Sequence, residues 1–443
     1  LALARCEVRR VGPAAISGRS LQLSFSAVLS LVLLTPTIRE LVPVPVPSPA
    51  VVQGMRLKLW KWHEAGLMTA IASLAVTVVS APLVAMTFQR LGVAGLVSNV
   101  VAMPISGALT LLAASSAAVF VNAPPLAVPI LWLGTRLSSV LLAIAQWFAA
   151  LPFSTWELAA PSLAVALLWW VGLACFVLVK GRWRWTALAT PVAAAIHLLA
   201  PVQPAESLEV TFLAVGHGDA TVISHRGHHV LIDGGGVPQG SDTGKRFVIP
   251  FLRQRRIREL DLAVLSHAHP DHALGLISTL EQVSTKRLWL SPSPAGPLTT
   301  DLMAAAEGAD VDVVERGHEG LSFGDVRLEV LGPPVDRATI EDENDRSIVL
   351  KLVHHDVSFL LTGDIEEVAE ELLGPTGEVT VVKAPHHGSD TSSSPGFVAA
   401  TRPKYVVFCV GVNNRFRFPR EDVVERWERA GARCYRTDRD GAI

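Results

Sequence analysis

Four side chains of types that commonly bind metal ions lie within six residues: His267, His269, Asp271 and His272. They follow a short apolar segment, 261–265, that is typical of a buried strand. In an extended segment alternate side chains share a face, so His267, His269 and Asp271 can converge. His272 then points to a neighbouring position. This spacing predicts a site for two divalent metal ions, and a surface histidine cluster is the weaker alternative.

Further candidate ligands lie at the ends of later predicted strands. Asp364 follows the apolar run 359–361, where its carboxylate could bridge two ions. Asp364 could equally cap the helix predicted just after it, and the two roles can coexist. His386 and His387 follow another predicted strand, which ends at Lys383. One of these histidines can complete the second metal site, and the other can contact an oxyanion.

A run of glycines follows the apolar strand predicted at 229–232. The glycines at 234–236 let the backbone pass close to a metal-binding loop, and Asp233 can accept a hydrogen bond that orients a ligand histidine. A plain glycine turn is the alternative.

Two other groups of histidines are predicted to be solvated, because each falls in a hairpin. His354 and His355 lie in one hairpin, and His225, His228 and His229 lie in another. We therefore leave all five out of the predicted metal site.

The second half of the sequence alternates short β-rich runs with helix-like segments, which indicates a layered α/β domain. The predicted strands are 208–214, 220–224, 229–232, 262–265, 326–331, 348–353, 357–361, 379–383 and 405–410, and the predicted helices are 245–254, 272–282, 366–373 and 420–430.

The first half holds six apolar runs, at 21–34, 66–88, 93–120, 126–151, 161–179 and 185–199. About 20 apolar residues are needed to cross a bilayer, so we expect the second to fifth runs to span it. The first and last runs are short and would need tilt or protein neighbours. The sequence thus predicts five or six membrane helices.

The two halves of the chain also differ in charge. Residues 1–205 carry 13 Lys and Arg against 4 Asp and Glu, whereas the remainder carries 25 against 36. The apolar first half excludes a purely soluble enzyme. Lys180, Arg182 and Arg184 lie between the last two apolar runs and are typical of a cytoplasmic loop. We therefore expect a multi-pass protein of the cell membrane whose part after Pro201 is extracytoplasmic.

Two further features of the sequence are its first residue and the spacing of its cysteines. The sequence begins with Leu1 and has no signal-peptide pattern, so we expect it to start inside a longer protein. The four cysteines include no C-x-x-C pair, which argues against a disulfide framework or a thiolate zinc site.

The motifs of the second half resemble those of metallo-β-lactamase-fold hydrolases, and they lie at 215–220, 231–235, 267–272, 344–350, 362–364, 386–389 and 436–438. The first half resembles a competence-type permease, at 23–27 and 81–104. The two in this order resemble the C-terminal part of the ComEC family of DNA-internalisation competence proteins. We therefore expect a polytopic α-helical membrane domain of about five or six helices at 1–204, followed by an α/β domain, an αββα sandwich of the metallo-β-lactamase type, at 205–443.

The resemblance implies a channel that passes one DNA strand inward and an external nuclease domain that degrades the other strand. It implies phosphodiester hydrolysis assisted by two divalent metal ions, Zn²⁺ or Mn²⁺. The further partners it implies are a DNA receptor and a cytoplasmic translocation ATPase.

The resemblance also assigns roles to individual side chains. Asp271, His386 and Ser389 would serve catalysis, with His386, Ser389 and Gly388 facing the phosphate and His386 able to protonate the leaving oxygen. The implied metal ligands are His267 and His269 for one ion, Asp271, His272 and His387 for the other, and Asp364 as a bridge.

Three residues depart from the pattern of the family. Asn344 stands where many enzymes of this fold place a third histidine on the first ion, so we expect it, like Asp233, to lie behind the ligands. His217 replaces a usual glutamine, and Phe418 stands where relatives commonly have a histidine.

A basic and aromatic loop is the predicted DNA contact. Arg415 and Arg417 can bind phosphates, and Phe416 can stack on a base of a single strand. The excess of acidic groups in the second half argues against nucleic acid. Two alternatives therefore remain: a DNA channel whose hydrolase-like domain binds or gates DNA without cutting it, and a membrane-anchored hydrolase of another phosphodiester.

Overall fold

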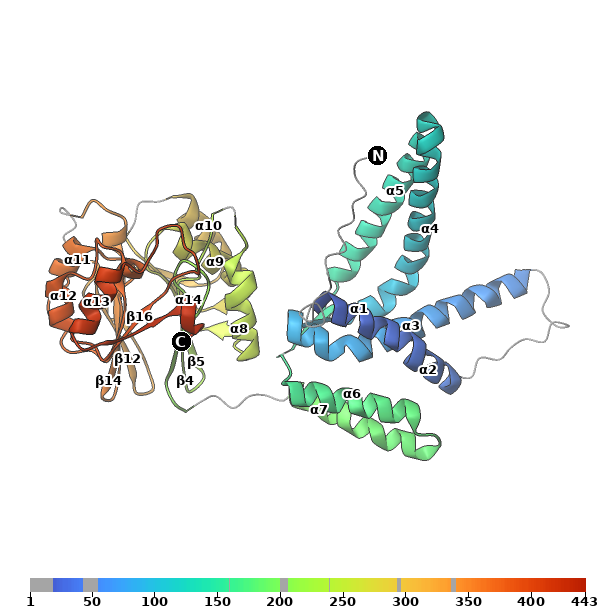
Figure 1. Cartoon of the computed structure of the whole chain (residues 1–443), viewed down its shortest axis with the longest axis horizontal. Coiled ribbons are helices and arrows are strands. Elements are labelled where there is room, and N and C mark those ends of the chain that lie inside the picture. The colour runs from blue at the N-terminus through green and yellow to red at the C-terminus, as the bar shows by residue number, and fades with distance from the viewer. Residues whose placement is uncertain are drawn as a thin grey trace. The chain divides into compact units, whose positions relative to one another are not determined.

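The computed structural model describes residues 19–42, 55–158, 160–199, 206–238, 240–292, 296–335 and 340–443. They belong to two compact units, one within residues 1–200 and the other within residues 201–443 (Figure 1). The first unit is mainly helical, and the second contains two large sheets.

Long apolar helices make up most of the first unit. A small antiparallel pair, β1 (Arg90–Gly92) and β2 (Thr155–Glu157), links two of their connections. The helices are α1 (Arg19–Leu29), η2 (Ser30–Leu34), α2 (Thr35–Leu41), α3 (Met55–Phe88), α4 (Gly95–Asn122), α5 (Pro124–Ala149), α6 (Leu163–Leu178), η3 (Arg182–Leu188) and α7 (Ala189–Leu199).

Within the described residues, four helical segments are long and apolar enough to cross a membrane. They are Ser20–Leu41, Trp60–Phe88, Gly95–Val121 and Pro124–Ala149. The first apolar run, predicted to be short and to need tilt or protein neighbours, belongs to a longer helical segment, because Pro36 falls in the first turn of α2 and the helical path continues to Leu41. The fifth run, predicted to span, forms a helix of only 16 residues, α6.

Two tryptophans fasten α6 to α3. Trp169 Nε1 donates a hydrogen bond to the carbonyl oxygen of Val78 at 2.9 Å, and Trp170 Nε1 donates to that of Val79, also at 2.9 Å. Pro82 lies four residues after Val78 and has no N–H to offer that carbonyl. The Trp169 indole therefore satisfies a backbone acceptor that Pro82 leaves free, as an apolar surrounding requires.

The second unit is built on two sheets. The six-stranded sheet has the order β10 (Asp310–Val313), β9 (Arg287–Leu290), β7 (Leu262–Leu265), β5 (His228–Ile232), β4 (Thr221–His225) and β3 (Glu209–Phe212). The seven-stranded sheet has the order β11 (Leu321–Phe323), β12 (Val326–Gly332), β13 (Val349–His354), β14 (Val357–Leu361), β15 (Val381–Lys383), β16 (Tyr405–Phe408) and β17 (Arg433–Arg436). A separate short pair joins β6 (Glu259–Leu260) to β8 (Ser284–Thr285).

Helices and short helical turns connect these strands. They are η4 (Gly244–Val248), α8 (Ile249–Gln254), α9 (Pro270–Leu280), α10 (Pro297–Ala305), η5 (Asn344–Arg346), α11 (Glu367–Leu372), η6 (Pro385–Gly388), α12 (Pro395–Thr401), α13 (Glu421–Arg429) and α14 (Thr437–Asp440).

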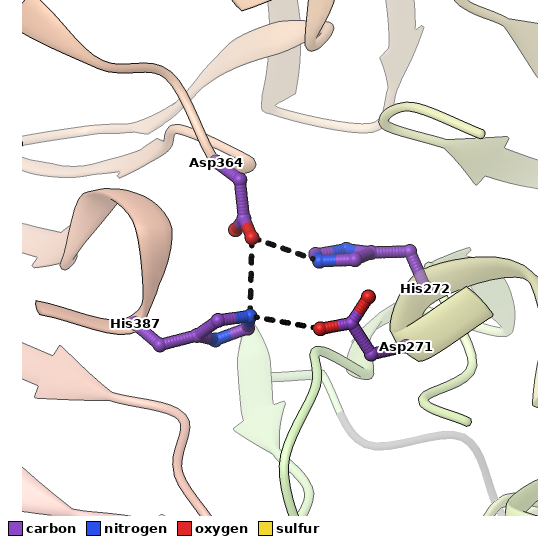
Figure 2. Close-up of side chains that lie close together, drawn as sticks. All are labelled: Asp271, His272, Asp364 and His387. Carbon is purple, nitrogen blue, oxygen red and sulfur yellow. Dashed lines mark hydrogen bonds and ion pairs between the residues drawn. The ribbon is translucent and has the colours of Figure 1, made fainter. Parts of the chain in front are cut away.

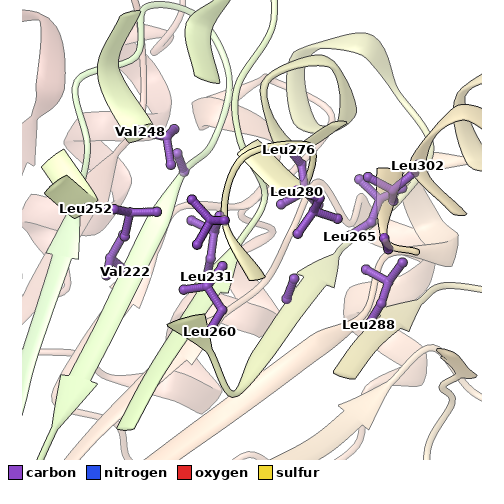
Figure 3. Packing of buried hydrophobic residues seen from close by; sticks show 14 of the residues in the cluster. Val222, Leu231, Val248, Leu252, Leu260, Leu265, Leu276, Leu280, Leu288 and Leu302 are labelled. Carbon is purple, nitrogen blue, oxygen red and sulfur yellow. The ribbon is translucent and has the colours of Figure 1, made fainter. Parts of the chain in front are cut away.

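The two sheets pack face to face, with helices on both outer faces. Along β7, Leu262 and Val264 point into the core between the sheets, whereas Ala263 and Leu265 point into the core beneath the helices. Figure 3 shows this second core, where Leu276 of α9 covers the sheet. On the far sheet, a third core packs β14, β15 and β16 against α11, α12 and α13. The predicted αββα sandwich is confirmed.

Parallel pairing brings several strand ends to one edge of each sheet. β5, β7 and β9 are parallel neighbours, and so are β14, β15 and β16. The loops after β5 and β7 carry Asp233 and His267, and those after β14 and β15 carry Asp364 and His387. The carboxyl edge of the strands is a common place for sites in such folds.

Candidate metal centre

Four side chains from three separate segments converge: Asp271, His272, Asp364 and His387 (Figure 2). His272 Nε2 lies 3.2 Å from Asp364 Oδ2, and His387 Nε2 lies 3.1 Å from the same oxygen. His387 Nε2 also lies 3.6 Å from Asp271 Oδ2. One donor atom from each residue lies within 4.8 Å of the others. Two imidazoles and two carboxylates placed in this way can bind a divalent ion.

The start of α9 places two of these ligands. Pro270 occupies the first turn, where its fixed φ suits a helix. The expectation of an extended chain beyond His269 is wrong, because the chain is helical from Pro270. The helical turn brings His272 as well as Asp271 into the group with Asp364 and His387.

His267 and His269 lie beside this group. The ring centroid of His267 is 4.2 Å from that of His272 and 4.6 Å from that of His269. His267 is fully buried, and its Nε2 atom has no hydrogen-bond partner among the described residues. A buried polar atom without a partner costs free energy, so this nitrogen fits a metal ligand better than a packed core histidine.

Asp233 holds one of the ligand histidines in place. Its Oδ2 atom lies 2.9 Å from His272 Nδ1, and its Oδ1 atom accepts a hydrogen bond from the Ser266 N–H at 2.8 Å. Both Asp233 and His272 are buried. This contact fixes the imidazole so that Nε2 faces Asp364, which is the geometry expected of a carboxylate behind a metal-binding histidine.

A tight turn after β14 positions Asp364. Gly363 has a φ of +55°, and a Cβ atom there would lie 2.7 Å from the Ser347 Cβ. The Asp364 N–H donates to Ser347 Oγ at 3.1 Å. The residue at the cap position of α11 is Glu366, so the alternative role of Asp364 as a helix cap is wrong.

Sequence reasoning missed two charged residues of this site, Lys383 and Asp219. Lys383 Nζ lies 3.0 Å from Asp364 Oδ1 and forms a second ion pair with Asp219. His387 Nδ1 lies 3.4 Å from the other oxygen of Asp219. Two features of the sequence could have revealed them: Lys383 ends an apolar strand, and Asp219 follows two spaced glycines. A lysine buried at a strand end needs carboxylate partners.

In the metal-free site, the carboxylates and the protonated imidazoles stabilise each other's charge. Burial alone would lower the pKa of His272 and His387, but Asp364 and their other carboxylate partners raise both pKa values well above the usual one. Burial would raise the pKa of Asp271, yet the two histidines hold it below the usual range. A divalent cation can supply the same positive charge when the imidazoles lose their protons, so the residues present fit bound metal.

His217, the replacement for the usual glutamine, also lies at this site. Its ring centroid is 4.6 Å from that of His387, and its Nε2 atom is 3.8 Å from Asp271 Oδ2. Burial, together with the neighbouring His387, lowers the pKa of His217 to about 4. Its imidazole is therefore neutral near pH 7.

The other predicted site residues, His386, Asn344 and Ser389, have hydrogen-bond or ion-pair partners outside the four-residue group. His386 Nδ1 lies 2.9 Å from Glu366 Oε1, and Asn344 Nδ2 donates to the same oxygen at 3.3 Å. Ser389 is buried, and its hydroxyl lies 2.9 Å from Thr391 Oγ1. Among the described residues, none of the hydrogen bonds of Ser389 Oγ reaches the four-residue group.

The predicted DNA-contact loop borders the site through His217. The ring of Phe416 lies 5.0 Å from that of His217 and stacks on Phe418 at 5.6 Å with an interplanar angle of 16°. The Arg415 guanidinium lies 4.6 Å from the Phe416 centroid. Arg415 and Arg417 form no ion pair with any described residue. The loop thus offers two unpaired cations beside an exposed aromatic ring.

Two family models match this chain, one in each unit. Residues 2–183 match the model described as a competence protein, and residues 213–412 match the metallo-β-lactamase superfamily. Together these matches place a competence domain before a metallo-β-lactamase domain, in the order that the motifs predict.

Several curated proteins are similar to parts of the chain. ComE operon protein 3 of Bacillus subtilis is 32% identical over 53% of this chain and 32% of its own length. Competence protein ComA of Neisseria gonorrhoeae is 31% identical over 54% of this chain and 32% of its own length. The uncharacterized protein YcaI of Escherichia coli is 27% identical over 86% of this chain and 49% of its own length. The alignments thus cover about a third to a half of these relatives.

Proposed function

We propose that this chain is a member of the ComEC family of competence proteins and that its second unit is a metal-dependent phosphodiesterase that cuts DNA beside a membrane channel. The convergence of Asp271, His272, Asp364 and His387 carries this proposal. The unpaired Nε2 atom of His267 beside them supports a second ion. His267 and His269 would hold one ion, Asp271, His272 and His387 the other, and Asp364 would bridge them.

The chain's own residues would orient the substrate and move protons. Two bound divalent ions, Zn²⁺ or Mn²⁺, would stabilise charge on the phosphate and lower the pKa of the attacking water. Lys383 holds Asp364 in place through an ion pair of 3.0 Å with Oδ1, the oxygen that does not contact the two histidines. His386 contacts Glu366 through Nδ1, and in its doubly protonated form it would donate the Nε2 proton to the leaving 3′ oxygen and stay neutral, with the remaining proton on Nδ1.

A single DNA strand is the substrate form that the border of the site supports best. Phe416 is 41% exposed, so one face of a base can stack on it. Arg415 and Arg417 beside it would bind the flanking phosphates. His217 lies between this ring and His387, so a strand stacked on Phe416 would bring its phosphate towards the proposed ions.

The membrane unit would form the channel part of this system. The four long apolar segments support a multi-pass protein of the cell membrane. The basic loop at Lys180, Arg182 and Arg184 supports a cytoplasmic position for that loop and an extracytoplasmic position for the second unit. In this proposal residues 1–204 pass one strand inward, residues 205–443 degrade the other, and a DNA receptor and a translocation ATPase act as partners.

Cleavage by the purified full chain tests the proposal. We expect labelled single-stranded DNA to be cut with Zn²⁺ or Mn²⁺ and to stay intact after chelation. Asp364→Asn should abolish cutting, whereas Asp301→Asn, an exposed change of the same kind on α10, should not. Cutting that survives chelation or Asp364→Asn would contradict the proposal. Hydrolysis of another phosphodiester, such as a wall-polymer decoration, without DNA cleavage would indicate a different substrate.

A second candidate function is DNA binding or gating without cleavage. Asn344 and Ser389 favour it, because their described contacts go to Glu366 and Thr391 and not to the ligand group. Phe418, which stands in place of a histidine, favours it as well. Full-chain DNA binding with no cleavage under any metal would select this function.

A further inference from the structure

One of the five hairpin histidines that the sequence predicts to be solvated is in fact buried. His225, the last residue of β4, is only 1% exposed, and its Nε2 atom lies 2.6 Å from Asp325 Oδ1. His355 Nε2 lies 2.8 Å from the other oxygen of Asp325, and His354 Nε2 lies 3.4 Å from it. The expectation of free, solvated side chains is therefore wrong for His225. Three imidazoles converge on one carboxylate.

We infer that His225, Asp325, His354 and His355, here called the hairpin cluster, form a second metal site whose natural occupant is a zinc-like divalent ion. All three histidines present the same atom, Nε2, to Asp325. Three imidazoles and a carboxylate are a donor set typical of tetrahedral Zn²⁺. Donor atoms around such an ion lie about 3.3 Å apart. The three nitrogen–oxygen distances bracket that value.

Both sheets contribute to the hairpin cluster. His225 belongs to the six-stranded sheet, whereas His354 ends β13 of the seven-stranded sheet. Asp325 lies in the turn between β11 and β12, and the next residue, Val326, pairs with His354. An ion here would tie the two sheets together, in addition to the apolar core between them.

The turn that carries Asp325 is shaped to admit the His225 ring. Gly324 has a φ of +61°, and a Cβ atom at this position would lie 3.3 Å from His225 Nε2. A side chain there would be strained and would crowd the nitrogen that faces Asp325. Glycine thus permits the close approach that brings His225 to the carboxylate.

The hairpin cluster is separate from the candidate metal centre. β5 begins at His228, next to the β4 turn, and ends at Ile232, just before Asp233. Five strand residues span roughly 15 Å, so the two groups lie at opposite ends of this strand. Emptying one site should leave the other intact.

An ion could reach the hairpin cluster from solvent. The His355 side chain is 66% exposed, and that of Asp325 is 30% exposed. Arg226 Nη1 lies 3.6 Å from Asp325 Oδ1, but its side chain is 55% exposed and can turn outward when a cation binds. Donor atoms of His225, Asp325 and His354 lie within 4.8 Å of one another. The exposed His355, which contacts the same carboxylate, would turn towards the ion and complete a set of four protein ligands, which fits a structural role better than a catalytic one.

Zinc content of the full chain in detergent tests the inference. In an Asp364→Asn background, which weakens the candidate metal centre, the double variant His354→Gln/His355→Gln should lose one equivalent of zinc. The matched control His228→Gln lies in the β4–β5 hairpin and contacts Asp261, so it should lose none. Asp325→Asn provides a second, independent variant if the double variant folds poorly.

Thermal unfolding gives a second readout that does not depend on activity. Added Zn²⁺ should raise the unfolding midpoint of the background chain and of His228→Gln by more than it raises that of the double variant, because the double variant lacks one site that binds Zn²⁺ in the folded state. Equal zinc content and an equal midpoint rise in the double variant and its background would overturn the inference. An equal loss of zinc in His228→Gln would overturn it as well.

Discussion

Lys383 and Asp364 form a buried ion pair behind the candidate metal centre, with 3.0 Å between Nζ and Oδ1 and only 3% of each side chain exposed. Lys383 also pairs with Asp219, and its Nζ atom donates to the Gly363 carbonyl oxygen at 2.7 Å. The ammonium group therefore links the loop after β3 to the turn after β14. The free energy of unfolding should therefore depend on the charge state of this site.

Lys383→Met should strongly destabilise the metal-free chain, because it removes the ammonium group that the buried carboxylates of Asp364 and Asp219 share. Removing one partner of a buried pair costs about 3–5 kcal/mol. Zn²⁺ should restore part of this loss by supplying positive charge beside Asp364. Thermal unfolding with chelator and with Zn²⁺ measures both effects.

Lys286→Met is the matched control for this change. Lys286 pairs with Glu259 and Asp261 at the surface, and its side chain is 54% exposed. Exposed pairs contribute about 0–1 kcal/mol. An equal loss of stability in the two variants would contradict the special role of the buried ammonium group.

Asp219 should make the metal-free fold sensitive to acid. Burial raises its pKa, but Lys383 and His387 outweigh burial and lower the pKa to about 2. The folded pKa thus lies below the unfolded value of about 3.9, so this stabilisation is present above pH 4 and is lost as the pH falls towards 2. It amounts to on the order of 2 kcal/mol.

The pH dependence of unfolding in Asp219→Asn tests this assignment. The variant should be less stable than the parent at pH 6, and the difference should shrink between pH 4 and pH 2. A difference that stays constant over this range would mean that Asp219 contributes through packing and not through its charge.

The strands that hold the site could be predicted because their apolar runs are short and bounded by turns. The runs 262–265 and 357–361 predict strands with the bounds of β7 and β14. β10, with four exposed residues, and the polar β17 lack such a run and are missed. β9 and β11 are missed as well, although they contain apolar residues. Their pairing depends on neighbours that a local pattern does not contain.

The candidate site could be predicted only in part, because some of its residues meet only through the packing of the two sheets. His267, Asp364 and His387 follow strands, so their meeting at one edge could be inferred. Lys383 and Asp219 come from different sheets, and only the packing of the two sheets brings them together. The same packing buries His225 against a turn of the other sheet, which the local hairpin pattern cannot reveal.

The orientation of the chain can be tested by labelling single cysteines, after the four native cysteines are removed. Trp183→Cys lies in the basic loop and is exposed, so an impermeant reagent should reach it only in opened cells. Asp390→Cys, at a 60% exposed side chain of the second unit, should react in intact cells. Arg429→Cys, on α13, serves as a second position in that unit. The opposite pattern would contradict an extracytoplasmic second unit.

Arg415→Ala and Arg417→Ala should weaken DNA binding without removing the chemistry. Each loses a cation that forms no ion pair with the described residues, so KM should rise and the salt dependence of binding should become shallower by about one phosphate contact. kcat at saturating DNA should stay close to that of the parent. Arg429→Ala removes the same charge from α13 and should change neither constant. Equal effects of Arg417→Ala and Arg429→Ala would indicate that only net charge matters.

Asp271→Asn should produce the opposite kinetic pattern. The substitution keeps the shape of the side chain but removes a ligand charge that lies 3.6 Å from His387 Nε2, so kcat should fall by orders of magnitude while DNA affinity changes little. Asp390→Asn, an exposed change of the same kind, should leave kcat unchanged. Thermal unfolding separates loss of chemistry from loss of fold. If Asp271→Asn cuts DNA as fast as the parent does, this group of side chains is not the catalytic centre. If it instead raises KM with kcat intact, Asp271 acts in binding DNA and the non-cutting function is favoured.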